Sequence, residues 1–173
     1  ENEIVTNSFL QTSTPTIYAC GDVTTPLKFT HTASHQANIV IGNILNENVK
    51  ENDLSIFPWA IFTEPEIAHV GLSEKQARKE FGDKISVFKV DANMDRFITD
   101  KNSIGFLKVI FNSDNLVIGA DAIGAHAGEW IQFLTVAIKN KITAESFADT
   151  IFVYPTYSEI VKKAFTRYFR SKE

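Results

Sequence analysis

The hydrophobic positions in the first part of the chain follow two patterns. Residues 15–20 are rich in β-favouring side chains and end abruptly at Gly21-Asp22, which predicts a short buried strand followed by a turn. Beyond Thr30 the apolar residues recur at spacings of three and four, which predicts an amphipathic helix of about four turns. The residues that set this spacing are Ala33, Ala37, Val40, Ile41, Ile44 and Leu45.

A polar stretch separates this part from the rest of the chain. Residues 46–53 are mostly turn formers with little to bury, which predicts a boundary between a first domain, 1–52, and a second domain, 53–173. In the second domain the patterns predict five strands, at 59–63, 67–71, 85–90, 104–111 and 116–123. They also predict three helices, which begin at a Ser73–Gln76 capping box, at Ala127 and after Thr156. This order predicts an α+β fold with helices grouped on one side of an antiparallel sheet.

Composition narrows the class of protein. The 173 residues are 44% hydrophobic and 22% charged, which is typical of a globular protein and excludes a disordered or coiled-coil chain. The net charge is −4 with scattered basic residues, and no apolar run approaches the roughly 20 residues that cross a bilayer. We therefore expect no nucleic-acid or membrane partner. The chain opens at Glu1 and its only methionine is Met94, so we expect it to be a piece of a longer protein.

The cysteine and glycine content limits the chemistry. Cys20 is the only cysteine, which excludes an internal disulfide framework and fits a reducing, cytoplasmic compartment; we expect it to be a small buried hydrophobic residue. None of the eight glycines stands in a G-x-G arrangement, so the chain holds no complete dinucleotide fingerprint. His31 and His35 are spaced for two ligands of one metal ion, but no third ligand lies nearby, and we favour no metal site.

Two short segments are candidates for ligand contacts. Gly21-Asp22 follows the predicted strand, where an open α/β sheet places ligands, although a plain turn is the alternative. In the second domain, Tyr154 and Tyr157 bring two phenols next to Thr156 and Glu159. The latter two residues are also explained as a Thr-x-x-Glu capping box with no other role.

Taken in order, several motifs resemble the pyridine nucleotide-disulfide oxidoreductases over nearly the whole chain. The run 14–23, together with the start of the helix at 29–33, resembles the second FAD-binding segment of this family. The run 62–74 resembles the opening of its C-terminal dimerisation domain, and segments 105–109 and 118–129 are similar to later parts of that domain. The resemblance implies an α+β dimerisation domain preceded by the tail end of an α/β FAD-binding domain.

The resemblance also implies cofactors and a first set of site residues. Gly21 and Asp22 would lie at FAD, with the carboxylate of Asp22 on its ribityl chain. The helix that begins with Thr30, His31 and Ala33 would lie beside the flavin, where its positive N-terminal end would stabilise negative charge. Whole enzymes of this family pass a hydride from NAD(P)H to FAD and then reduce a small-molecule acceptor.

The second set of site residues would act across a homodimer interface, where Tyr154 and Glu159 would enter the active site of the partner subunit. Disulfide-reducing members of the family carry histidine where this chain has Tyr154. A phenol, with an ordinary pKa near 10, does not replace imidazole as a base near neutrality. Tyrosine here resembles mercuric reductase, yet the chain ends without that enzyme's vicinal cysteine pair.

We expect the 173 residues alone to be inactive as a reductase. A non-catalytic dimerisation or interaction module is the alternative function.

Overall fold

The computed structural model describes residues 3–46 and 49–172. Contacts divide the chain into two compact units, Glu1–Leu54 and Ser55–Glu173, which are described separately below. The family segments expected from the sequence fall one in each unit, and the assignment of domains to 1–52 and 53–173 stays a prediction. No helix of the described residues is both long enough and apolar enough to cross a membrane.

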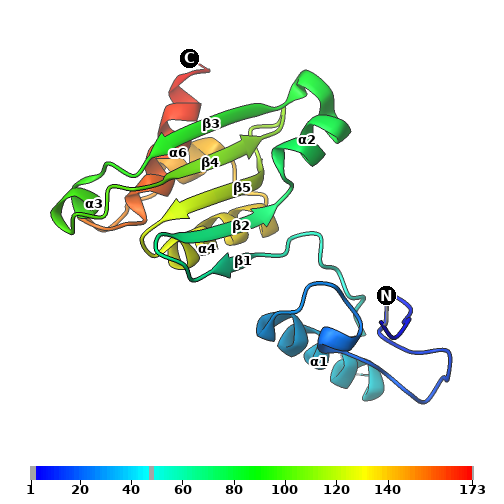
Figure 1. The fold of residues 1–173 in the computed structure, drawn as a ribbon. Helices are drawn as coiled ribbons and strands as arrows, with labels where there is room; N and C mark the ends of the chain where they lie inside the picture. The colour runs from blue at the N-terminus through cyan, green and yellow to red at the C-terminus, as the bar shows by residue number, and fades with distance from the viewer. Residues whose placement is uncertain (1–2, 47–48, 173) are drawn as a thin grey trace. The chain divides into compact units, whose positions relative to one another are not determined.

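The second unit is built on one antiparallel sheet (Figure 1). Its strands are β1 (Trp59–Ile61), β2 (Glu66–Gly71), β3 (Ser86–Asp91), β4 (Phe106–Phe111) and β5 (Val117–Gly124), in the spatial order β1-β2-β5-β4-β3. Each of the five predicted strands is present, and a turn at 112–115 joins β4 to β5 as a hairpin. The α+β fold class is therefore confirmed.

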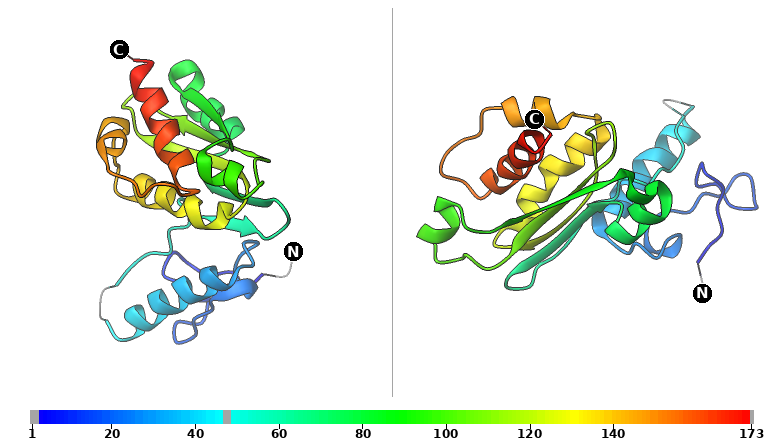
Figure 2. Two further views of the ribbon diagram at one scale, coloured as in Figure 1. Left: turned by 90° about the vertical axis from the view of Figure 1, so that its left-hand side faces the viewer. Right: turned by 90° about the horizontal axis from the view of Figure 1, so that it is seen from above.

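Helices α4 (Ala127–Lys139) and α6 (Glu159–Arg170) cover one face of the sheet, with the short α5 (Ala144–Asp149) beside α6 (Figure 2). Alternate strand residues point at these helices because successive side chains of a strand face opposite sides. Aromatic rings fill the space between sheet and α6: Phe111 stacks on Tyr168 at 3.8 Å, and Phe147 stacks on Phe165 at 4.0 Å. These fully or nearly buried rings form a core that the second unit makes from its own residues.

The opposite face of the sheet carries α2 (Glu74–Phe81), which the Ser73–Gln76 capping box begins as predicted. A one-turn 3₁₀ helix, η2 (Gly82–Lys84), follows it. The chain between β2 and α2 passes very close to Gly119 of β5. A Cβ added at Gly119 would lie 1.9 Å from the carbonyl oxygen of Leu72, so only glycine fits there. Two short helices were not expected from the sequence: α5, and α3 (Asp95–Thr99) in the connection between β3 and β4.

The described residues of the first unit form a 3₁₀ turn, η1 (Gly21–Val23), and the helix α1 (Thr30–Ile44). The predicted helix is confirmed, but the predicted strand at 15–20 is wrong: only an isolated bridge joins Gln11 to Tyr18. A strand needs neighbours for its backbone groups, and the described residues of this unit offer none beyond that bridge.

The expected burial of α1 is also different. Its buried residues are largely polar, while Ile41 and Ile44 on the predicted apolar stripe are more than half exposed; the buried set is Thr32, Gln36, Ile39 and Asn43.

Candidate functional site

Residues 153–158, which we call the tyrosine loop, form the second part of the connection from α5 to α6. Tyr154 is 66% exposed, and its hydroxyl donates a hydrogen bond to a carboxylate oxygen of Asp95 in α3. This hydrogen bond, with the negative charge of Asp95, raises the pKa of Tyr154 above its ordinary value. The phenol therefore stays protonated near neutrality.

Glu159 lies at the first turn of α6 and closes the other end of the tyrosine loop. Its carboxylate accepts a hydrogen bond from the backbone N–H of Thr156 at 3.0 Å. The expected capping box is only half formed, because the hydroxyl of Thr156 donates to the carbonyl of Val153 at 2.8 Å and does not cap the helix. The helix starts at Glu159, so the prediction of a last helix after Thr156 is confirmed.

Tyr157 ties the same loop to α3. Its hydroxyl donates to Oδ2 of Asp100 at 2.6 Å, and Nε of Arg96 donates to the same oxygen at 2.7 Å. The edge of the Tyr157 ring meets Phe97, which is fully buried, at 4.8 Å between centroids. The hydrogen bond from Tyr157 is the main cause that lowers the pKa of Asp100, with Arg96 adding to it and partial desolvation opposing it.

The five cofactor residues expected from the sequence lie together in the first unit. Gly21 and Asp22 form η1, and Thr30, His31 and Ala33 form the first turn of α1. Gly21 has a φ of +80°, and a Cβ added to it would lie 3.2 Å from that of Ala33, so a side chain here would be strained and crowded. The turn and the helix start are thus packed against each other.

A buried glutamine holds this arrangement, and sequence reasoning missed it. Gln36 is 1% exposed, and its Oε1 accepts hydrogen bonds from the backbone N–H of Gly21 at 2.6 Å and from the hydroxyl of Thr24 at 3.1 Å. The sequence carries no strong signal for this role beyond the presence of a polar residue, Gln36, on the predicted helix. A buried side-chain amide needs hydrogen-bond partners, and here they lie on the neighbouring turn.

The start of α1 fits a ligand with hydroxyl groups and an electronegative edge. Phe29 at the N-cap has no side-chain oxygen, so its side chain does not cap the helix. Asp22 is exposed in η1, which contacts α1, and the hydroxyl of Thr32 is buried without a hydrogen-bond partner among the described residues. The N-terminal end of a helix attracts negative charge, and a carboxylate accepts hydrogen bonds from hydroxyl groups.

His31, His35 and Cys20 are the remaining candidates for metal or thiol chemistry. The part of the chain that the structure describes holds no group of three or more His, Cys, Asp or Glu side chains arranged for a metal ion, and His31 and His35 belong to none. Cys20 is a free thiol that is half-buried. It is less buried than expected, because the strand that was to bury it does not form.

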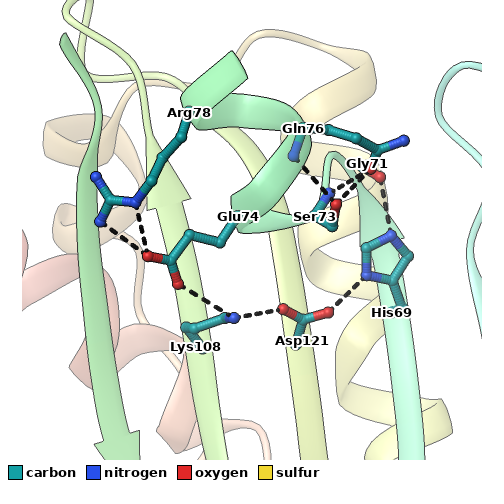
Figure 3. A network of polar contacts seen from close by, with 8 residues as sticks. All are labelled: His69, Gly71, Ser73, Glu74, Gln76, Arg78, Lys108 and Asp121. Atoms are coloured by element: carbon teal, nitrogen blue, oxygen red, sulfur yellow. Dashed lines mark hydrogen bonds and ion pairs between the residues drawn. The ribbon is translucent and has the colours of Figure 1, made fainter. Parts of the chain in front are cut away.

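A chain of polar contacts crosses the sheet face opposite α4 and α6 (Figure 3). His69 on β2 pairs with Asp121 on β5 at 2.8 Å, and Lys108 on β4 bridges Asp121 at 2.9 Å and Glu74 at 3.4 Å. Arg78 completes the chain by pairing with Glu74 at 2.8 Å. Strand register places His69, Asp121 and Lys108 in one cross-strand row, so this ionic chain fastens α2 to the sheet.

The shared charges of this ionic chain shift the pKa values of its members. Burial alone would raise the pKa of Asp121, but hydrogen bonds from His69 and Lys108 outweigh it and lower the value. Burial alone would lower the pKa of Lys108, and its hydrogen bond to Asp121 outweighs that and raises it. The hydrogen bond from Arg78 is the main cause that lowers the pKa of Glu74.

Comparison with known proteins decides which family this architecture represents. The family model described as "Pyridine nucleotide-disulphide oxidoreductase, dimerisation domain" matches residues 57–165. A second model, described as "Pyridine nucleotide-disulphide oxidoreductase", matches residues 1–37. The chain belongs to the pyridine nucleotide-disulphide oxidoreductase family. The resemblance inferred from the motifs is thereby confirmed, and so are the α+β dimerisation fold and the FAD and NAD(P)H cofactors as properties of the family.

Curated members of this family are similar to the chain over most of its length. It is 36% identical to a mercuric reductase of Lysinibacillus sphaericus, over 94% of the chain and 30% of that protein. It is 36% identical to a dihydrolipoyl dehydrogenase of Mycoplasma genitalium, over 97% of the chain and 38% of that protein. The chain thus spans about a third of the length of the curated relatives it matches.

Solved structures of the family have the same fold. LpdA from Mycobacterium tuberculosis superposes with a TM-score of 0.88 at 28% identity, over 96% of this chain and 36% of that one. The HOCl-induced flavoprotein disulfide reductase RclA from Escherichia coli gives a TM-score of 0.88 at 27% identity, over 95% and 38%. The match extends over both units of the chain.

Proposed function

We propose that the chain is the dimerisation part, with a short FAD-binding segment, of a FAD-dependent oxidoreductase that oxidises NAD(P)H. In this proposal two copies form a homodimer, and Tyr154 and Glu159 of one subunit complete the active site of the other. The match of the family's dimerisation domain to residues 57–165 carries the proposal. A small-molecule electron acceptor and a cytoplasmic location remain predictions from the sequence.

The first unit would hold one edge of the flavin cofactor. FAD, when bound, supplies the hydride acceptor that NAD(P)H reduces. Asp22 would accept hydrogen bonds from hydroxyl groups of its sugar-alcohol chain, and Gly21 would let the backbone approach closely. The first turn of α1, which begins at Thr30, would face the electronegative edge, where the positive end of the helix dipole stabilises negative charge.

The tyrosine loop would contribute a neutral phenol to the partner's active site. The hydrogen bond to Asp95 raises the pKa of Tyr154, so this residue does not act as a proton-accepting base near pH 7. Glu159, which hydrogen-bonds the backbone of Thr156, would hold the loop in shape. An acceptor that needs an imidazole base at this position, such as a disulfide, is therefore disfavoured.

An apolar groove next to the tyrosine loop is the proposed dimer surface. It has a volume of about 630 Å³ and lies between α4, α5 and residues 150–153. Ile151 is 94% exposed and Val153 is 77% exposed, and Phe133 of α4 lies beside them with a large part of its ring open. Such a patch in a dimerisation domain is proposed to be covered by a second copy of the chain.

Oligomeric state tests this proposal. Val153→Asp should convert the dimer of the 173-residue chain to a monomer, because it would bury a charge in an apolar interface. Val5→Asp is the matched control, since Val5 is also highly exposed, at 85%, but lies in the other unit, and it should leave the dimer intact. Sedimentation equilibrium at micromolar concentration measures both. A parent chain that is monomeric, or a Val153→Asp chain that stays dimeric, would contradict the proposal.

A further inference from the structure

The tyrosine loop is held by a second segment of the same unit, the connection between β3 and β4. Residues 93–102 of this connection contain α3, and three side-chain contacts reach from the loop and α6 to it. Tyr157 donates to Asp100 at 2.6 Å, Tyr154 donates to Asp95, and Lys163 of α6 donates to Asn93 at 3.1 Å. The carboxylates of Asp95 and Asp100 therefore accept hydrogen bonds from the two tyrosine hydroxyl groups.

The contact of Tyr157 with Asp100 is better packed than the contact of Tyr154 with Asp95. Tyr157 packs on the fully buried Phe97 and shares Asp100 with Arg96, so this pair fixes the loop against α3. Tyr154 projects into solvent from that fixed base, with its hydroxyl on Asp95. An exposed hydrogen bond of this kind contributes little to folding stability. Its principal effect is to choose one orientation of the Tyr154 side chain.

The direction of the hydrogen bond decides what Tyr154 can offer to a ligand. A phenol has one O–H donor and oxygen lone pairs that accept. Carboxylates at neutral pH only accept, so the hydroxyl proton points at Asp95 and the lone pairs point away from it. The carboxylates of Asp95 and Glu159 both disfavour ionisation of the phenol, which keeps this arrangement in place.

We propose that Asp95 is a positioning residue for Tyr154: its carboxylate accepts the hydrogen bond from the hydroxyl group, so that the phenol oxygen faces the substrate as a hydrogen-bond acceptor. The proposal rests on the proposed function for the site itself. It deepens that function by naming the substrate chemistry: an electron acceptor that presents an N–H, an O–H or a cationic group at this point. A substrate that presents only a carboxylate or another anion meets lone pairs and two acidic side chains instead.

Titration of Tyr154 in the 173-residue chain tests the positioning. The chain has four tyrosines, so a ¹³Cζ-tyrosine-labelled sample gives few signals, and the Tyr154→Phe chain identifies the one that is missing. In the parent chain the Tyr154 signal should titrate above the ordinary phenol value. Asp95→Asn keeps the shape of the side chain but removes its charge, and should move the midpoint to lower pH.

Asp114→Asn is the matched control. Asp114 is also exposed, but lies in the hairpin at the opposite end of β4, so this variant should leave the Tyr154 midpoint unchanged. Equal midpoints in the parent and Asp95→Asn chains would overturn the proposal. So would an equal shift in the Asp114→Asn chain, because it would show a general charge effect in place of a specific contact.

Activity of the full-length protein separates this proposal from the function on which it rests. Asp95→Asn should lower kcat/KM about tenfold for a substrate that presents a donor or cation, and leave an anionic substrate unaffected or improved. Equal losses for both substrates would refute the acceptor role of the oxygen. If Tyr154→Phe has full activity while the titration behaves as expected, the proposed function of Tyr154 fails and the Asp95 contact stands as a structural one only.

Discussion

Lys108→Met should destabilise the second unit by about 1–3 kcal/mol. Lys108 joins the two carboxylates of the ionic chain, at 2.9 Å from Asp121 and 3.4 Å from Glu74 (Figure 3). Its side chain is 26% exposed and that of Asp121 is 34% exposed, so both charges are partly removed from water. Methionine has a similar length and volume, so the substitution removes the charge and its hydrogen bonds and leaves little cavity.

The magnitude follows from what is left behind. Asp121 keeps its hydrogen bond from His69 but loses the one from the Lys108 ammonium group at 2.9 Å. A fully buried pair that loses one partner costs about 3–5 kcal/mol, and an exposed pair costs about 0–1 kcal/mol. Since the side chains are about two-thirds buried, a value between these limits is expected. Glu74 retains Arg78 and adds little to the loss.

Urea unfolding followed by tryptophan fluorescence measures this loss in the correct unit, because both tryptophans, Trp59 and Trp130, lie in it. Lys89→Met is the matched control. Lys89 lies opposite Lys108 on the neighbouring strand and points to the same face, but its side chain is 57% exposed and it pairs with an exposed Asp91 at 3.4 Å. This variant should lose less than about 1 kcal/mol.

The free energy of unfolding that the ionic chain contributes should fall as the pH is lowered. The pKa values of Asp121 and Glu74 are lowered in the folded chain, so their contribution is fully present above the ordinary carboxyl pKa of about 4 and is lost as pH falls through the lower folded values. The difference between the parent and Lys108→Met should therefore shrink in this acidic range. An equal loss for Lys108→Met and Lys89→Met, or a difference that does not change down to pH 2, would refute the reasoning.

Two further substitutions test other contacts. Tyr168→Phe should cost about 1 kcal/mol in the same urea assay, because the hydroxyl of this buried ring donates to Asn115 at 2.7 Å; an unchanged midpoint would show that the bond contributes nothing. Gln36→Leu should leave the buried N–H of Gly21 without its acceptor and speed amide exchange at Gly21 at least about tenfold by NMR, whereas an unchanged exchange rate would contradict the role assigned to Gln36.

The sheet of the second unit was predictable because its signals are local. Short runs of β-favouring residues bounded by turn residues mark the strands, and the Ser73–Gln76 capping box marks the start of α2. The short helix α3 was not predictable, because Asp95–Thr99 is only five residues long and depends on contacts with the tyrosine loop. Helices this short have little stability of their own.

In the first unit, local sequence signals predicted only part of the structure correctly. Residues 15–20 have the composition of a strand, but the described residues provide only the bridge between Gln11 and Tyr18. Strand composition without a partner does not make a sheet. In α1 the apolar spacing found the helix but assigned the wrong buried face, because the packing depends on Gln36 and Asn43, whose amides bind backbone groups of this unit.

The candidate site was partly visible in the sequence. The motifs brought Gly21, Asp22 and the start of α1 into one hypothesis, and the structure places these residues side by side. The role of Asp95 was not visible, because 58 residues separate it from the Tyr154–Pro155 segment in sequence and only the fold brings them together. Long-range pairs of this kind carry no local pattern.

Subunit mixing in the full-length protein tests the central claim most directly. One inactive variant carries Asp22→Ala, and the other carries Tyr154→Ala with Glu159→Ala, both being dimers. If each active site combines the FAD segment of one subunit with the tyrosine loop of the other, mixed dimers contain one intact site. Random mixing then restores about a quarter of the sites. Activity of the mixture that stays at the level of the separate variants would contradict the account.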